Sequence, residues 1–153
     1  MAAQTEWINI YIIGGRNATP EVIERQLDVI TEGIRALRDV RILTPEDTHI
    51  GDTAYKMAIN KVIEVRMIPR WYDLSIWCDI WFSATSPDTR PTLLFYLKPD
   101  IDNEWVRLSA AAHDHLISCY ILTEETTTEA VRDMMASTQR IINQLLSLRS
   151  DPR

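Results

Sequence analysis

The 153-residue sequence has little of what marks the specialised classes of protein. Two cysteines are too few for a disulfide framework, and four glycines and seven prolines are too few for a fibrous or disordered chain. Lysine and arginine number 16 against 22 aspartates and glutamates, which gives a formal net charge of −6. This balance excludes the usual strongly basic nucleic-acid binder, because neutralising phosphates needs an excess of cationic side chains.

Long hydrophobic runs are also missing. No apolar run approaches the roughly 18 residues that a membrane-spanning helix needs, and residues 1–6 lack the basic and apolar regions of a signal peptide. Cys78 and Cys119 each lie inside an apolar segment, so we expect buried free thiols rather than a disulfide or a metal site. We therefore expect a cytoplasmic protein with no membrane or nucleic-acid partner.

The remaining composition, 46% hydrophobic and 25% charged, is typical of a globular domain. We expect one domain over residues 1–153 with a loose tail over 149–153. Residues 7–13, β-branched and aromatic, predict a buried strand. Thr19-Pro20-Glu21 then predicts a helix start, and apolar residues follow at intervals of three and four as far as Leu37.

Later segments continue the alternation of strands and helices. Strands are predicted over 40–44, 74–84, 92–97 and 116–122, and a short helix over 104–113. Thr126 and Glu129 match a capping box that opens a long amphipathic helix.

The segment 52–70 fits both a helical pattern and a strand pattern. We expect a helix over 53–66, which would carry the chain back across a sheet. The predicted fold is therefore α/β, with a mostly parallel, doubly wound sheet in which 92–97 is the candidate antiparallel hairpin strand. The alternative is an α+β two-layer sandwich, if 62–68 is a strand that pairs with 74–84.

Gly14, Gly15 and Arg16 lie between the first strand and the first helix. Glycines at that turn allow a ligand to approach the backbone, the helix N-terminus attracts anions, and Arg16 would add a positive charge for a phosphate. The segment is neither a Walker loop nor a dinucleotide fingerprint. A plain glycine turn with a solvated Arg16 is the alternative.

Trp77 and Trp81 flank Asp79 on one face of the predicted 74–84 strand. Beside a cleft, the two indoles could stack on a base or sugar while Asp79 accepts a hydroxyl hydrogen bond. The alternative is a tryptophan pair packed under a helix or within a subunit interface.

Residues 100–125 are acidic, with six acids and one arginine, which accounts for −5 of the net charge of −6. Carboxylates gathered near one cleft can raise the pKa of a neighbour, as acid/base catalysis requires, although a solvated loop has the same composition. His113 and His115 follow without an evident third ligand, so we predict neither a metal nor a cofactor.

The order of these features resembles the nucleoside 2-deoxyribosyltransferase-like superfamily, whose small members occur in phages and bacteria. The resemblance rests on four segments in about residues 7–122: Ile10 to Gly15 with Pro20, Val40 to Pro45, Leu74 to Ile80, and Glu104 with Ala110 to Ala112. It differs where the family has Gly-Thr before its glutamate and Gly after it, because this chain has Asp102-Asn103-Glu104-Trp105-Val106.

The resemblance implies a doubly wound fold and a pocket for a nucleoside or nucleotide. It makes Glu104 the nucleophile that attacks the anomeric carbon, Tyr11 the residue that positions Glu104, and Asp79 a ligand or proton-transfer group. The implied chemistry is hydrolysis of an N-glycosidic bond or transfer of a deoxyribosyl group. Gly14, Gly15, Arg16, Trp77 and Trp81 are the candidate ligand-binding residues.

A non-catalytic interaction module that acts as a homo-oligomer is the competing hypothesis. It is motivated by the tryptophan-rich strand and by Met134 and Met135, which could form a subunit seam. The acidic segment beside Glu104 would repel an anionic substrate unless Arg16 compensates. The charge therefore favours a neutral nucleoside or a protein partner.

Overall fold

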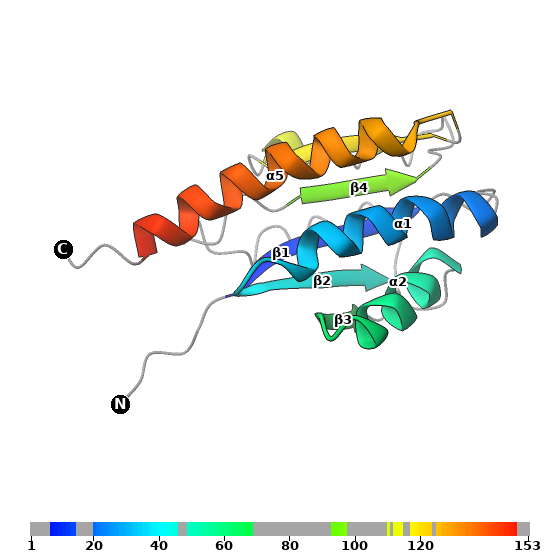
Figure 1. The fold of residues 1–153 in the computed structure, drawn as a ribbon, viewed down its shortest axis with the longest axis horizontal. Helices are drawn as coiled ribbons and strands as arrows, with labels where there is room; N and C mark the ends of the chain where they lie inside the picture. Colours follow the sequence, from blue (N-terminus) through cyan, green and yellow to red (C-terminus); the bar gives the residue numbers. More distant parts are fainter. Residues whose placement is uncertain are drawn as a thin grey trace.

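The protein is described by a computed structural model that covers residues 7–14, 20–45, 49–68, 93–97, 110, 112–114, 117–123 and 125–149. These residues contain a five-stranded sheet in which every pairing is parallel and the strand order is β3-β2-β1-β4-β5 (Figure 1). The predicted α/β class with a parallel sheet is confirmed. The strands are β1 (Ile8–Gly14), β2 (Val40–Pro45), β3 (Glu64–Ile68), β4 (Leu93–Leu97) and β5 (Ser118–Leu122).

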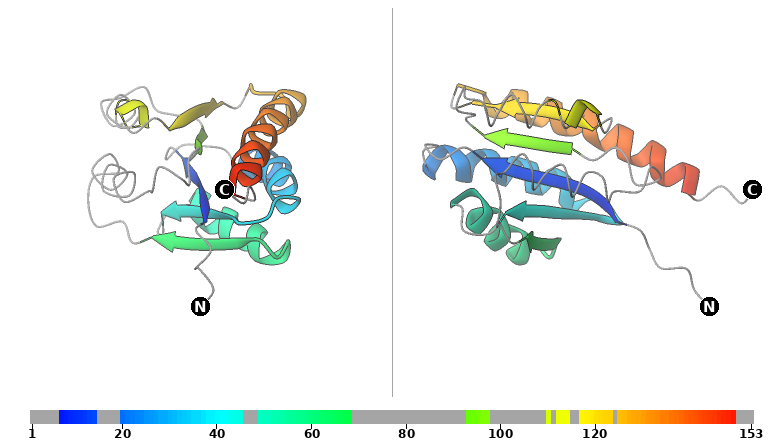
Figure 2. Two further views of the ribbon diagram at one scale, coloured as in Figure 1. Left: turned by 90° about the vertical axis from the view of Figure 1, so that its left-hand side faces the viewer. Right: turned by 180° about the vertical axis from the view of Figure 1, so that it is seen from behind.

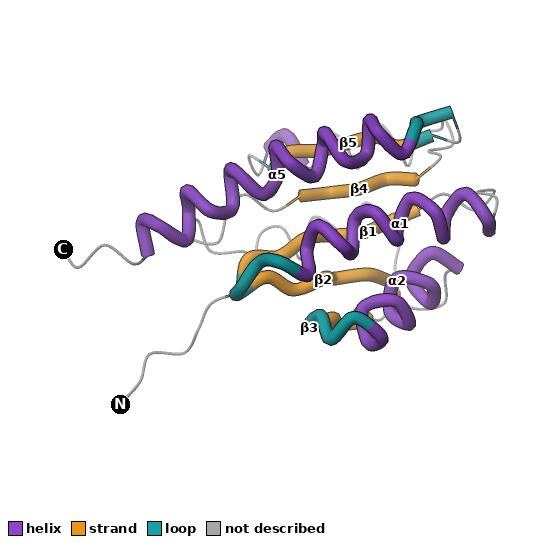
Figure 3. The backbone as a smooth tube through the Cα atoms, in the orientation of Figure 1, coloured by secondary structure: helices purple, strands orange, loops and turns teal. Residues whose placement is uncertain are grey.

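Three long helices lie on one face of this sheet, here called the helical face. They are α1 (Pro20–Arg35), α2 (His49–Asn60) and α5 (Thr128–Arg149) (Figures 2 and 3). The short helical turn at 112–114 lies on the opposite side, here called the far face (Figure 2). The described chain therefore has helical structure on both sides of one parallel sheet.

The core lies between β1 and the helices. Alternate residues of β1, Ile8, Ile10 and Ile12, join the apolar stripe of α1 in one buried cluster. Full burial of one such side chain contributes roughly 1.5–3 kcal/mol. The stripe of α1 consists of the residues that the 3.6-residue period singled out: Ile23, Leu27, Ile30 and Ile34.

α1 and α5 approach each other closely at Gly33. A Cβ atom placed on Gly33 would lie 2.9 Å from Cε and 3.2 Å from Cβ of Met135, so only a glycine fits without movement. The Gln139 amide donates a hydrogen bond of 2.8 Å to the Gly33 carbonyl oxygen. A glycine inside a helix costs about 1 kcal/mol relative to alanine, and here it allows the two helices to pack closely.

The start of α5 differs by one residue from the predicted capping box. The Thr127 hydroxyl accepts a hydrogen bond from the Ala130 amide at 3.1 Å, so Thr127 is the N-cap. The Thr126 hydroxyl instead accepts from the Thr123 amide at 2.9 Å and closes the turn after β5. The buried Gln26 of α1 donates to the Thr123 carbonyl at 2.7 Å, which fixes this turn against α1.

Two sequence predictions need correction. The helix expected over 53–66 covers 49–60, and residues 64–68 form β3, so both patterns seen in this segment are present in succession. The segment 92–97 is not an antiparallel hairpin strand: β4 lies between β1 and β5 and pairs with both in parallel. The α+β alternative requires a strand within 62–68 that pairs with 74–84: that strand is present as β3, which pairs in parallel with β2, and its pairing with 74–84 is not tested. The predicted strand 74–84 lies outside the described residues.

The end of α2 has an unusual residue at a position that favours glycine. The Ile63 amide donates to the Ala58 carbonyl at 2.8 Å and the Val62 amide to the Ile59 carbonyl at 3.2 Å, which together form a Schellman motif. Val62 is the C′ residue and has a φ of 58°. A β-branched residue in this left-handed region is strained. The motif stops α2 and turns the chain into β3.

Candidate functional site

The strand order reverses direction between β1 and β4. From β1 the chain moves through β2 to β3 on one side, whereas β4 and β5 lie on the other side. In parallel α/β sheets, ligands bind outside the carboxyl ends of the strands where the order reverses. Here Gly14, the last residue of β1, pairs with Leu97, the last residue of β4. This pair marks the candidate site, at the carboxyl end of the sheet where α1 begins (Figure 1).

Several of the predicted site residues follow this pair closely in sequence. Gly14 lies at the site itself, Gly15 and Arg16 come directly after it, and Glu104 belongs to the segment that follows Leu97. The placements of Gly15, Arg16 and Glu104 lie outside the described residues, as do those of Asp79, Trp77 and Trp81. The topology therefore places Gly14 and Leu97, the residues from which these two segments continue, side by side at the carboxyl end of the sheet.

Tyr11 is the one predicted catalytic residue that the structure describes. It lies in the middle of β1 and is fully buried. Because Ile10 and Ile12 face α1, Tyr11 points to the far face. Its Cα lies three residues before Gly14, about 10 Å along the strand. A fully buried phenol at that depth is suited to positioning another group rather than to contacting a ligand outside the sheet.

A polar row crosses the far face beside Tyr11. The Arg41 Nε donates a hydrogen bond of 2.8 Å to the Asn9 Oδ1, and the register aligns Asn9, Arg41 and Glu64 across β1, β2 and β3. Burial lowers the pKa of Arg41, and the nearby Arg66 lowers it further, whereas Tyr11 and Glu64 act in the opposite direction. Two guanidinium groups thus lie close enough to repel one another on this face.

The sequence analysis did not identify Asn9, Arg41 or Arg66. The available signal was the alternation of charged and apolar residues over 63–67, which we interpreted as the end of a helix. Assigned as a strand, that alternation places Glu64 and Arg66 on one face. The parallel register then aligns Glu64 with Arg41.

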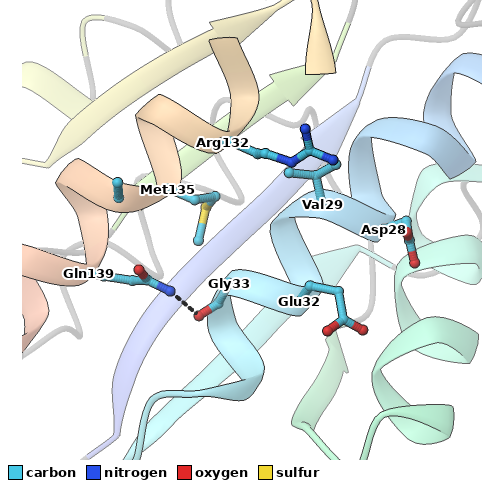
Figure 4. A pocket seen from close by; sticks show the side chains of 8 residues that line it. Asp28, Val29, Glu32, Gly33, Arg132, Met135 and Gln139 are labelled. Carbon is cyan, nitrogen blue, oxygen red and sulfur yellow. Dashed lines mark hydrogen bonds between the residues drawn. The ribbon is translucent and has the colours of Figure 1, made fainter. Parts of the chain in front are cut away.

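A shallow groove lies between α1 and α5, with Asp28 and Glu32 on one wall and Arg132 and Gln139 on the other (Figure 4). The Lys61 ammonium lies 2.7 Å from Asp28 and 3.2 Å from Glu32. Met135 and the hydrogen bond from Gln139 to Gly33 form the floor of the groove. The acidic side chains are thus already paired, and we assign the groove to helix packing.

Thiol and metal chemistry find no support within the described ranges. Burial raises the pKa of the Cys119 thiol to about 11, so at neutral pH this cysteine is a protonated, unreactive group. His113 is exposed, and the described residues contain no group of three or more ligand-type side chains that could hold a metal ion. No helix in the described part of the chain has the length and apolar character to cross a membrane.

Comparisons with protein-family models, with curated proteins and with solved structures find no match to this chain.

Proposed function

We propose that the protein binds a nucleoside or nucleotide in the crevice between the carboxyl ends of β1 and β4. The observation that carries the proposal is the reversal of strand order at the Gly14–Leu97 pair. The N-terminus of α1 begins at Pro20, six residues after Gly14, and the first turn of a helix attracts negatively polarised groups of a ligand. Trp77 and Trp81 are the proposed stacking surface for the base, and Arg16 the proposed cation.

The proposed chemistry is cleavage or transfer of the N-glycosidic bond. The Glu104 carboxylate attacks the anomeric carbon, the bond to the base breaks, and Asp79 supplies the proton that the leaving base takes up. Water or a second base then displaces the glycosyl group from Glu104. Tyr11 positions the carboxylate, a role that fits its complete burial in β1.

Charge favours a neutral nucleoside over a nucleotide. The segment 100–125 holds −5 of the net charge of −6 and begins three residues after β4 ends at Leu97. A phosphate there would be repelled unless Arg16 neutralised it.

The direct test is calorimetric titration with a panel of nucleosides and nucleotides, followed by measurement of base release. We expect saturable binding of at least one nucleoside, and release that is abolished by Glu104→Ala. Glu32→Ala is the matched control, because Glu32 is an exposed glutamate near the C-terminal end of α1, at the opposite end of the helix from the crevice. Absence of binding across the panel would refute the proposed function. Binding without base release would leave a binding protein and refute the enzyme.

Self-association as an interaction module is the second candidate function. The surface that favours it is not the expected one around Met134 and Met135. Met135 is only 3% exposed and packs inside the chain against Gly33, so it is not available for a subunit seam. Large apolar side chains are instead exposed on and after α2: Tyr55, Ile59 and Val62. Light scattering of the wild type and of Trp77→Ala and Trp81→Ala tests this candidate, since a protein that stays monomeric throughout would refute it.

A further inference from the structure

The outer edge of β3 is the end of the described sheet. β3 pairs with β2 on one side, and within the described ranges no strand pairs with its other side. A free edge exposes backbone donors and acceptors that can pair with another strand. The two charged side chains of β3, Glu64 and Arg66, are both exposed. Among the described residues neither of them has an oppositely charged group within ion-pair distance.

The sequence of β3 is complementary to itself in antiparallel pairing. If Val65 lies opposite Val65 of the partner subunit, Glu64 lies opposite Arg66 of the partner subunit and Arg66 opposite Glu64 of the partner subunit. Directly opposite residues share one face of a sheet, so both pairs form on the far face. A shift of the register by two residues in either direction would place Glu64 against Glu64, or Arg66 against Arg66. The charges therefore select a single register.

Arg66 has a further reason to gain a carboxylate partner. Arg66 pairs with Leu43, two residues after Arg41, so the two guanidinium groups share the far face, and Arg66 lowers the pKa of Arg41. Arg41 is held in place by Asn9 and cannot turn away without breaking that 2.8 Å hydrogen bond. A carboxylate from a second copy would offset this repulsion.

The helical face offers an apolar surface next to the same edge. Tyr55 and Ile59 lie four residues apart on α2 and are 39% and 54% exposed; together they are called the α2 stripe. α1 connects β1 to β2 and α2 connects β2 to β3, and right-handed crossovers place both helices on the same face. α2 therefore lies nearer the β3 edge than α1 does. By helical geometry the α2 stripe is turned about 60–140° from the buried residues Ala54 and Ala58. It lies on the flank opposite Lys61, which contacts Asp28 and Glu32 of α1.

We propose that two copies of this chain pair antiparallel through β3, about a two-fold axis at Val65, to form a continuous sheet whose seam is flanked by the α2 stripes. The proposal rests on the proposed self-association and names its interface. Two five-residue strands form a small interface, so we expect a weak, two-fold symmetric dimer.

The test is a charge swap measured by sedimentation equilibrium from about 1 to about 500 µM, a range suited to weak interfaces. We expect the wild type to dimerise. Glu64→Arg and Arg66→Glu should each raise the dimer Kd by about tenfold to a hundredfold, because two attractive cross-strand pairs become repulsive. The double variant restores both pairs and should return Kd to within about threefold of the wild type. Glu24→Arg and Arg25→Glu, exposed changes of equal charge on α1, are the matched controls.

The possible outcomes separate the interface from self-association itself. A wild type that stays monomeric overturns both the proposed self-association and the β3 interface. A dimer that the single swaps leave unchanged, or that the double swap fails to restore, overturns the β3 interface alone. Hydrogen exchange of residues 63–68 in the wild type needs no variant: we expect slower exchange above the dimer Kd than below it. Equal exchange would contradict the proposal.

Discussion

Val62 gives the sharpest prediction about stability. It is the C′ residue of α2 with a φ of 58° and is 92% exposed. The left-handed conformation costs an L-residue roughly 1–2 kcal/mol, whereas glycine adopts it freely. Replacing Val62 with glycine also adds roughly 0.5–1 kcal/mol of backbone entropy to the unfolded chain. Almost no buried area is lost. We therefore expect Val62→Gly to stabilise the protein by about 0.5–1 kcal/mol.

Urea unfolding followed by circular dichroism measures this change. The midpoint should rise without a change in slope, and Tm should rise by roughly 1–4 °C for a chain of this size. Measurements at low protein concentration exclude a contribution from self-association. Ile59→Gly is the matched control: Ile59 is also exposed on α2 but lies within the helix, so it should lose about 1 kcal/mol. A Val62→Gly variant that is no more stable than the wild type would refute the strained Schellman end of α2.

Three further predictions concern the packing of α1 and the chemistry of β5. Gly33→Val should cost about 1–3 kcal/mol in a urea titration, because its side chain would meet Met135; unchanged stability would contradict the close helix approach. Gln26→Leu should cost about 1–3 kcal/mol, since the Thr123 carbonyl loses its buried donor, and hydrogen exchange at the start of α5 should accelerate. In a Cys78→Ser variant, the Cys119 thiol, with its pKa raised to about 11, should react much more slowly with a thiol reagent at pH 8 in the native protein than after denaturation. Fast labelling of Cys119 in the native protein at pH 8 would argue against the burial of this thiol. The raised pKa also contributes stability to the folded state that is present below pH 9.0 and lost as pH rises toward about 11.

Regular periodicity made much of the fold predictable. The stripe from Ile23 to Ile34 has a single period, and Thr19-Pro20-Glu21 marks its beginning, so α1 followed directly from the sequence. β1 and β2 are short apolar runs bounded by turn residues, and both were placed within a residue or two. These local signals agree with the tertiary packing, which is why they sufficed.

The errors arose where the decisive interaction is not local. A helix pattern and a strand pattern overlap in 52–70, and the boundary is set by a Schellman motif around Val62, where no glycine announces it. The direction of β4 depends on its partners β1 and β5, far away in the sequence, rather than on the turn residues before it. In the same way, the row of Asn9, Arg41 and Glu64 exists only through the register of three strands.

The candidate site could be anticipated in part. The sequence predicted the glycine turn after β1 to be a ligand-binding position, and Gly14 lies where the strand order reverses. That Leu97 ends beside Gly14 could not be known without the strand order, because it depends on β4 entering next to β1 rather than at the outer edge. The roles of Glu104, Asp79, Trp77 and Trp81 stay predictions.

The most direct measurement of the central claim is an amide NMR titration of the full chain with the nucleoside that binds most tightly. If the ligand occupies the crevice between β1 and β4, saturable shifts should gather in residues 14–17 and in 98–104, the two segments that leave the sheet at the Gly14–Leu97 pair. The amides of the α1–α5 groove around Gly33 and Gln139 should stay unchanged. Shifts centred on that groove, or spread evenly without saturation, would contradict the proposed site.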